Sequence, residues 1–185
     1  MVYVFLAEGF EDIEALAPVD ILRRAGVDTR LVSISPDNIV TSAHGVRFVT
    51  DSVISDVDFS DAELLFLPGG LPGATNLDAC SVLREALVKH YKAGKLIAAI
   101  CAAPLVLGHL GLLDGVQATC YPGFESELGD ARYTASLVER DAQFITGKGP
   151  GAAMELGYTM LEALGKTVEA DQLREGMMYN FLLRG

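Results

Sequence analysis

Short apolar runs alternate along this chain with segments of helical periodicity. Continuous apolar runs of this length, bounded by turn residues, are typical of strands that are buried on both faces. We predict such strands over residues 2–7, 29–35, 64–67 and 96–100. The remaining pattern predicts helices over residues 12–25, about 75–92, from 102 onward, 152–164 and 168–180.

Strands that alternate with helices of this length indicate a mostly parallel sheet with helices on both faces, the α/β sandwich. A hairpin is predicted over residues 136–146, and two shorter segments, 39–40 and 46–49, are expected at a sheet edge. No repeat, low-complexity tract or linker interrupts this order. We therefore expect one domain over residues 1–185.

Composition narrows the class of partners. Of 185 residues, 50% are hydrophobic and 21% are charged, and the formal net charge is −11 at pH 7. Nucleic acids and anionic membrane surfaces bind clustered Lys and Arg, and this chain has no basic run. The charge therefore argues against nucleic acid as the main partner and against a membrane surface.

The apolar start and the cysteines indicate the compartment. Residues 2–6 are apolar but lack a preceding basic region, so they favour a first strand over a signal peptide. A longer apolar run at 96–113 is interrupted by Pro104 and Gly108, which favours a strand and a helix over a membrane span. Three unevenly spaced cysteines indicate neither a disulfide framework nor a metal site. We expect a reducing, cytoplasmic location.

Ligands of such sheets bind beyond the carboxyl ends of the strands, so the loops that follow strands are where chemistry is expected. The first strand runs into AEGFEDIE at 7–14, which places four carboxylates around a helix start. The third runs into PGGLPG at 68–73, whose glycines can expose backbone N–H groups. The fourth runs directly into Cys101.

Small residues flank Cys101 in the stretch AICAA at 99–103. From the residues alone two interpretations stay open: a buried structural thiol, or a nucleophile at the sharp turn where a strand becomes a helix. Such an elbow needs small neighbours because its backbone is tight, and a helix start would favour the thiolate over the thiol. Pro104 suits the first turn of that helix.

Four motifs in a fixed order carry a family resemblance: AEGFEDIEALAPVDILRRAG at 7–26, LPGG at 67–70, AAICAAPLVLG at 98–108 and TGKGPGAAMELG at 146–157. With them the chain resembles the ThiJ/PfpI superfamily, specifically its DJ-one branch, over essentially its whole length. The resemblance implies a flavodoxin-like three-layer α/β/α sandwich. It also implies a homodimer and a reactive cysteine at a nucleophile elbow.

The resemblance also implies roles for individual residues. Cys101 corresponds to the nucleophile, and Glu14 to a protonated carboxyl group that is hydrogen-bonded to the sulfur. Gly69, Gly70 and Ala102 correspond to the backbone donors around it. Glu14 lies one turn inside a helix and precedes ALA at 15–17, so burial is expected to keep it neutral. No metal and no cofactor is implied.

The activity that the resemblance implies is cysteine-dependent chemistry on reactive carbonyls, or on amines and thiols that carry them: deglycase and glyoxalase reactions. An alternative from another class is a redox-sensing or chaperone-like stress protein with an oxidisable cysteine. Protease and thiamine-pathway roles are weaker alternatives. A glutamine amidotransferase is weaker still, because no His-x-Glu follows the cysteine.

Four residues depart from the pattern of the family. The wider superfamily often has histidine directly after the cysteine, but this chain has Ala102, so an adjacent Cys-His dyad is absent. Tyr121 stands where the branch commonly has histidine, and tyrosine is a poor general base at neutral pH. His44 and Lys148 stand where arginine is frequent, so anion affinity is expected without bidentate geometry. We assign these last three residues to the substrate pocket.

The remaining candidates have structural interpretations. Cys80 lies on an apolar helical stripe and is predicted in the core. Cys120 is predicted as a plain strand-end residue, with a resolving thiol as the alternative. His90, near a helix end, is expected to be an exposed cation, and His109 a semi-buried histidine. The glycine-rich segment 147–151 is expected to form a tight loop beside the site.

Overall fold

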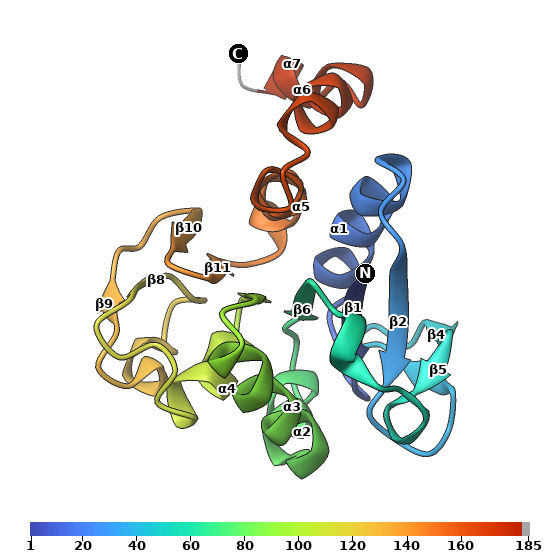
Figure 1. Ribbon diagram of the computed structural model, residues 1–185, viewed down its shortest axis with the longest axis vertical. Helices are drawn as coiled ribbons and strands as arrows, with labels where there is room; N and C mark the ends of the chain where they lie inside the picture. Colours follow the sequence, from blue (N-terminus) through green and yellow to red (C-terminus); the bar gives the residue numbers. More distant parts are fainter. Residues whose placement is uncertain (183–185) are drawn as a thin grey trace.

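A computed structural model describes residues 1–182 as a seven-stranded sheet with helices on both faces (Figure 1). The strand order is β10-β11-β7-β6-β1-β2-β5, and every neighbouring pair is parallel except β10 and β11. The predicted domain extends to residue 185, and residues 183–185 lie outside the described part. The strands are β1 (Val2–Leu6), β2 (Thr29–Ser33), β5 (Ser52–Val53), β6 (Leu64–Leu67), β7 (Leu96–Ile100), β10 (Val138–Asp141) and β11 (Phe144–Gly147).

Two groups of helices cover the two faces of the sheet, which confirms the three-layer α/β/α sandwich (Figure 1). One face carries α1 (Asp12–Arg24) and α5 (Ala153–Ala163); the other carries α2 (Gly73–Ala79), α3 (Ser81–Lys92) and α4 (Pro104–His109). Successive side chains of a strand point to opposite faces. In β1, Val2, Val4 and Leu6 accordingly pack with α1 and α5, while Tyr3 and Phe5 pack with the opposite layer. Both faces are apolar, which explains the continuous apolar runs.

A glycine lets α1 and α5 pack closely. A Cβ atom added at Gly157 would lie 2.9 Å from Cδ1 of Ile21 and 3.1 Å from Cα of Pro18. Only a residue without a side chain fits this contact. The contact fixes the position of α1, whose first turn carries Glu14.

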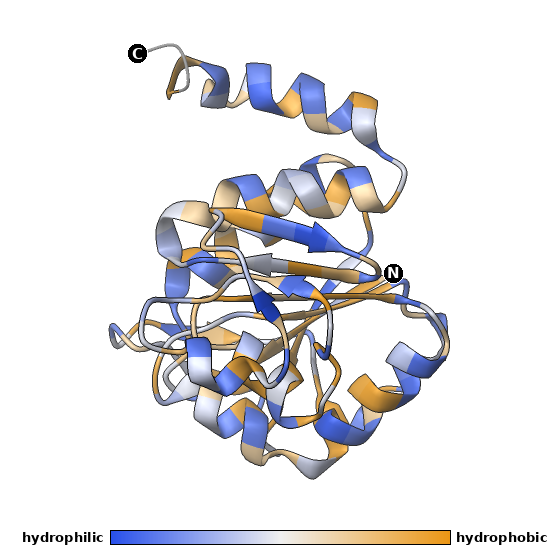
Figure 2. Cartoon of the chain, turned by 90° about the vertical axis from the view of Figure 1, so that its left-hand side faces the viewer, coloured by the Kyte–Doolittle hydropathy of each residue, from blue (hydrophilic) through white to orange (hydrophobic). Residues whose placement is uncertain are grey.

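Smaller elements surround the sheet. β3 (Ile39–Thr41) and β4 (Arg47–Val49) form a separate antiparallel hairpin, and β8 (Gln117–Ala118) pairs with β9 (Arg132–Tyr133). Short 3-10 turns are η1 (Ile54–Asp56), η2 (Phe59–Asp61), η3 (Glu125–Leu128) and η4 (Pro150–Ala152). The helices α6 (Thr167–Gly176) and α7 (Tyr179–Leu182) lie beyond α5, and Figure 2 shows α6 largely in the hydrophilic colours.

The segments at 39–49 were expected at an edge of the main sheet, and this prediction was wrong. The strands pair with each other, and Phe48 packs edge-on against Phe10, with ring centroids 5.4 Å apart. Residues 52–53 form the sheet edge instead. The apolar contact with the loop after β1 holds the hairpin near the carboxyl end of the sheet.

Three predicted helices differ from the observed ones. The helix at 75–92 is broken at Cys80, whose backbone is extended (φ −82°, ψ 102°), because α2 ends there and α3 begins. The helix expected from Ala102 begins at Pro104, because Cys101 has a positive φ and residues 101–103 form a turn. The last predicted helix is divided at Met178, where φ is 62°. Cys80 is therefore half-buried rather than a full core residue.

Two histidine predictions were also wrong. His90 is only 5% exposed, and its Nε2 lies 3.0 Å from the carbonyl oxygen of Leu96. The buried ring is therefore hydrogen-bonded to the first residue of β7. Burial lowers the pKa of His90 to about 4, which makes it neutral at pH 7. His109 is exposed rather than semi-buried, and its ring bridges the carboxylates of Asp78 and Glu127.

Within residues 1–182, every helix is too short or too polar to cross a lipid bilayer.

Candidate functional site

Cys101 lies at the sharp turn that follows β7. Its φ of 64° is in the left-handed region, which costs a residue with a side chain about 1–3 kcal/mol. Two backbone hydrogen bonds hold this conformation: the Cys101 N–H donates to the oxygen of Gly147 at 2.8 Å, and the Tyr121 N–H donates to the oxygen of Cys101 at 2.8 Å. The elbow thus depends on two segments that follow it in the chain, 119–122 and 146–148.

Glu14 is completely buried beside Cys101. The first turn of α1 positions it, because the N-cap side chain of Glu11 accepts a hydrogen bond from the Glu14 N–H at 2.7 Å. Its Oε2 accepts a hydrogen bond from the Gly69 N–H at 3.0 Å. Its Oε1 is buried without a hydrogen-bond partner, and the Cys101 side chain lies close enough to the carboxyl group to affect its pKa.

The two glycines after β6 admit this carboxyl group. A Cβ atom at Gly69 would lie 2.6 Å from Glu14 Oε2 and 2.7 Å from the Cβ of Cys101. Gly70 has a φ of 87°, and a Cβ atom there would lie 2.5 Å from the backbone nitrogen of Glu11. Residues with side chains cannot occupy these two positions without displacing Glu14 or the start of α1.

Cys101 and Glu14 titrate as a pair. Burial raises the pKa of Glu14 to about 7. Burial also raises the pKa of Cys101, to about 12, and the negative charge of Glu14 adds to this rise. The pair therefore loses its first proton near pH 7 and resists losing the second, because two negative charges would lie side by side away from water.

Backbone donors influence which atom carries the single charge. The N–H groups of Gly70 and Ala102 act on the sulfur and lower the pKa of Cys101. Gly69, which the family resemblance also assigned to the sulfur, donates to the Glu14 carboxyl group instead. The sulfur thus has two N–H donors, and the carboxyl group has one.

The other predicted pocket residues lie farther out. His44 is exposed, and its Nδ1 lies 2.8 Å from Oδ2 of Asp12, so its ring pairs with a carboxylate. Lys148 donates from Nζ to the oxygen of Ala135 at 3.0 Å. The Tyr121 side chain is 46% exposed, while its backbone supports the elbow. Cys120 is buried just past β8, as expected for a strand-end residue.

Two supporting residues were not identified from the sequence. Gly147 accepts the hydrogen bond of the Cys101 N–H, and Thr146 is buried and accepts one from the Thr119 N–H at 2.9 Å. Both belong to the TGKGPGAAMELG motif, which carries part of the family resemblance and whose segment 147–151 was expected to form a tight loop beside the site. The motif could be recognised in the sequence, but nothing indicated that the backbone oxygen of Gly147 would face the cysteine.

Three possible metal ligands gather near the start of α1. The ligand atoms of Glu11, Asp12 and His44 lie within 4.8 Å of one another. Glu11 already accepts the Glu14 N–H, and Asp12 already pairs with His44. These two hydrogen bonds, one within the start of α1 and one between α1 and His44, therefore account for this cluster.

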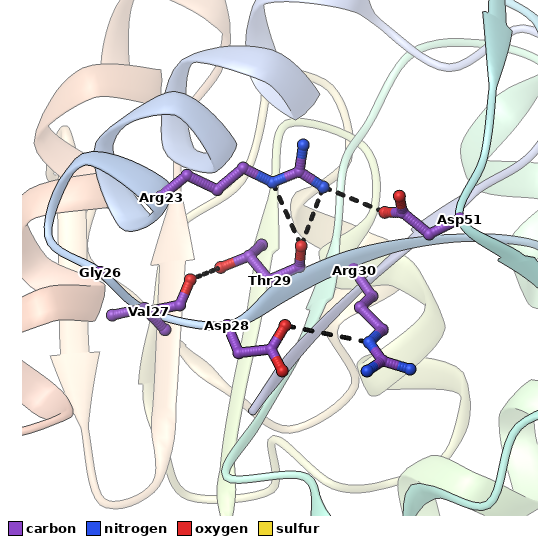
Figure 3. Close-up of a pocket in the computed structure, with 7 residues that line it drawn as sticks. All are labelled: Arg23, Gly26, Val27, Asp28, Thr29, Arg30 and Asp51. Atoms are coloured by element: carbon purple, nitrogen blue, oxygen red, sulfur yellow. Dashed lines mark hydrogen bonds and ion pairs between the residues drawn. The ribbon is translucent and has the colours of Figure 1, made fainter.

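A cavity of about 700 Å³ lies at the other edge of the sheet, around the start of β2 (Figure 3). Arg23 reaches across it to the oxygen of Thr29 and the carboxylate of Asp51, and Arg30 lies 3.9 Å from Asp28 (Figure 3). Since β2 and β7 run in the same direction, this cavity is at the amino ends of the strands, whereas Cys101 follows a carboxyl end. It is too far away to take part in chemistry at Cys101.

Comparisons with known proteins found matches over most of the chain. A model of the DJ-1/PfpI family matches residues 1–163. Protein DJ-1 homolog B of Arabidopsis thaliana is 41% identical over 165 residues, which cover 88% of this chain and 38% of that protein. The chain thus spans less than half the length of this plant relative.

Two further relatives match over most of their length. The glutathione-independent glyoxalase DJR-1.2 of Caenorhabditis elegans is 35% identical over 159 residues, covering 85% of this chain and 84% of that protein. The structure of oxidised DJ-1 from Toxoplasma gondii superposes with a TM-score of 0.91 at 35% identity, covering 96% of this chain and 97% of that one.

Proposed function

Because the chain belongs to the DJ-1/PfpI family, we propose that it is a cysteine-dependent enzyme that acts on small reactive carbonyls or on their adducts with amines and thiols. The contact of half-buried Cys101 with buried Glu14 carries this proposal. A relative with 35% identity is named a glutathione-independent glyoxalase, which supports the substrate class. The free cysteines fit a reducing location, and we propose the cytoplasm.

In the proposed first step, the Cys101 sulfur attacks the aldehyde-derived carbon of methylglyoxal or its adduct. With the free carbonyl, the oxygen takes up a proton and a hemithioacetal forms; with an adduct, the amine or thiol leaves with that proton. Glu14 is the donor, because its buried carboxyl group lies against the sulfur and has a pKa of about 7. The N–H groups of Gly70 and Ala102 stabilise negative charge at the sulfur and on the neighbouring oxygen.

In the proposed second step, Glu14 moves a proton from the sulfur-bearing carbon to the adjacent carbonyl carbon. The hydroxyl proton of the sulfur-bearing carbon passes to the oxygen of that carbonyl group. This converts the hemithioacetal into a thioester of lactate without net oxidation. Water then cleaves the thioester, which releases lactate and restores the thiol. One water is consumed for each lactate, and the amine or thiol of an adduct is recovered unchanged.

The test is a time course of lactate release from methylglyoxal and from preformed adducts, with metal-free wild type and Cys101→Ser. We expect lactate from both substrates with wild type and only the uncatalysed rate with the variant. Free methylglyoxal must be measured in parallel, because removal of the unbound carbonyl imitates adduct repair. Equal rates of lactate release for wild type and Cys101→Ser would refute the proposed enzymatic function.

One observation favours a second candidate, a redox sensor. A relative of 35% identity has been solved in an oxidised form. The same N–H groups of Gly70 and Ala102 that act on the sulfur can also hold the oxygens of a sulfinate. Stoichiometric oxidation of Cys101 by peroxide, without turnover of any carbonyl, would favour the sensor over the enzyme.

A further inference from the structure

A small cavity lies beside the elbow and is not part of the Cys101–Glu14 pair. Its volume is about 270 Å³. Three segments line it: Tyr121 and Pro122 after β8, Leu137 before β10, and residues 148–152 after β11. The segments are far apart in the sequence, and the fold brings them together at the carboxyl edge of the sheet.

The hydrogen bonds of the elbow place this cavity next to the nucleophile. Tyr121 donates its backbone N–H to the oxygen of Cys101, and the Cys101 N–H donates to Gly147, the residue before Lys148. Two of the three lining segments are thus bonded, directly or through the next residue, to the backbone of Cys101. The cavity therefore borders the segments that hold the elbow.

The walls of the cavity are apolar and aromatic. The side chains of Tyr121, which is 46% exposed, and Leu137, which is 50% exposed, offer apolar surface to a bound group. The Tyr121 ring lies against the backbone of Gly149, where an added Cβ atom would be 3.1 Å from Cδ2 of the ring. The ring is therefore supported from behind, while its other surface remains available.

We propose that this cavity is a subsite for the amine or thiol half of the adduct, and that it selects aromatic or branched aliphatic groups. The inference rests on the proposed function, in which that half is attached at the carbon attacked by Cys101. A cavity of about 150 Å³ is enough to hold benzene, so the volume here accommodates one ring and its linker. Tyr121 stacks on the group, and Leu137 packs against its edge.

Alkylation rates test the subsite without requiring turnover. The second-order rate constants of Cys101 with iodoacetamide and with N-benzyl iodoacetamide are measured, each divided by the rate of the same reagent with a free thiol. Peptide mass spectrometry restricts the measurement to Cys101, since Cys80 is also half-buried. We expect the wild type to prefer the benzyl reagent about threefold to tenfold.

Matched variants identify the residues responsible. Tyr121→Ala and Leu137→Ser should reduce the preference toward one, whereas Tyr121→Phe retains the ring and should preserve it. Val82→Ser is the control for Leu137→Ser, because Val82 is also 50% exposed but lines no part of this cavity. A wild-type preference of one, or an unchanged preference in both Tyr121→Ala and Leu137→Ser, overturns the subsite.

The outcomes separate the subsite from the proposed function. A benzyl preference that depends on Tyr121, together with no lactate release from any substrate, supports the subsite and overturns the enzyme. Lactate release with no benzyl preference supports the enzyme and overturns the subsite.

Discussion

At the scale of single residues, the site depends on one proton shared between Cys101 and Glu14. The carboxyl group is completely buried in a space that two glycines leave open beside Cys101. Two backbone N–H groups lower the pKa of the sulfur and one donates to the carboxyl group, but burial and the charge of Glu14 leave the pKa of Cys101 at about 12, above that of Glu14 at about 7. We nevertheless propose that the sulfur carries the charge of the singly charged pair and that protonated Glu14 is its hydrogen-bond donor, because a neutral carboxyl group removes the repulsion that raises the pKa of Cys101.

This assignment predicts the effect of removing the carboxyl group. Glu14→Leu should raise the pKa of the Cys101 thiol by about one unit or more, because the thiolate loses its donor. Alkylation by iodoacetamide below pH 7 should slow by about tenfold. Glu14→Gln, which keeps a neutral donor, should stay near the wild-type rate. Faster alkylation of Glu14→Leu would mean that Glu14 carries the charge and that the sulfur is a thiol.

A second prediction at this scale concerns His90. Its pKa is lowered from 6.5 to about 4 by burial, so protonation favours the unfolded chain. Its contribution to stability is complete above pH 6.5 and is lost as the pH falls toward 4. Between about pH 7 and pH 5 the wild type should lose about 2 kcal/mol more than His90→Gln, which keeps a donor for the Leu96 oxygen but does not titrate. Urea unfolding at both pH values measures this difference, and equal losses would contradict it.

At the scale of elements, the packing of α1 against α5 controls the site from a distance. Gly157 lies in the contact between the two helices, and α1 carries Glu14 in its first turn. A shift of α1 therefore moves the carboxyl group relative to Cys101. The elbow itself belongs to the sheet, since β7 and β11 hold it.

Gly157→Ala should lower the free energy of unfolding by about 1–2 kcal/mol, because the new methyl group meets the Pro18 backbone and forces the helices apart. The control is Gly176→Ala in α6, where an added Cβ atom meets nothing within 4 Å and alanine favours the helix. Denaturant titration of both variants gives the comparison. A loss of stability in Gly176→Ala equal to that in Gly157→Ala would show that helix propensity or the unfolded state, not packing, is responsible.

At the scale of the whole molecule, we propose that the protein is a homodimer formed through α1 and the 39–49 hairpin. Ile13 on α1 is 55% exposed, and Val46 and Val49 of the hairpin are 48% and 69% exposed. The hairpin is held to the loop after β1 by the hydrogen bond from the Ala43 N–H to the oxygen of Phe10. A second copy would cover this apolar surface.

Light scattering at micromolar concentration should therefore give twice the mass of the chain. Val49→Asp should shift the mass toward that of one chain, because a carboxylate is costly to bury in an apolar interface. Val82→Asp is the control, since Val82 is similarly exposed but lies on the opposite layer. The wild type at the mass of one chain would refute the dimer.

The order of elements was predictable from local pattern. The four central strands and the helices α1 and α5 occupy nearly their predicted positions, because apolar runs and helical periodicity record burial directly. The breaks at Cys80 and Met178 were not predictable from this pattern, because each depends on the backbone conformation of one residue, which no periodicity encodes. The 39–49 hairpin was misplaced because its pattern indicates pairing but not the partner.

The sequence by itself determined the α/β architecture and, through four ordered motifs, the family and the residues of interest. Only the tertiary structure decided what surrounds them: that Gly69 donates to Glu14 rather than to the sulfur, and that His44 pairs with Asp12. The physical reason is the distance along the chain between the residues that set each property. Hydrophobic periodicity is a property of neighbouring residues, whereas the pKa of Glu14, the neutrality of His90 and the elbow at Cys101 arise from groups that only folding brings within a few ångströms.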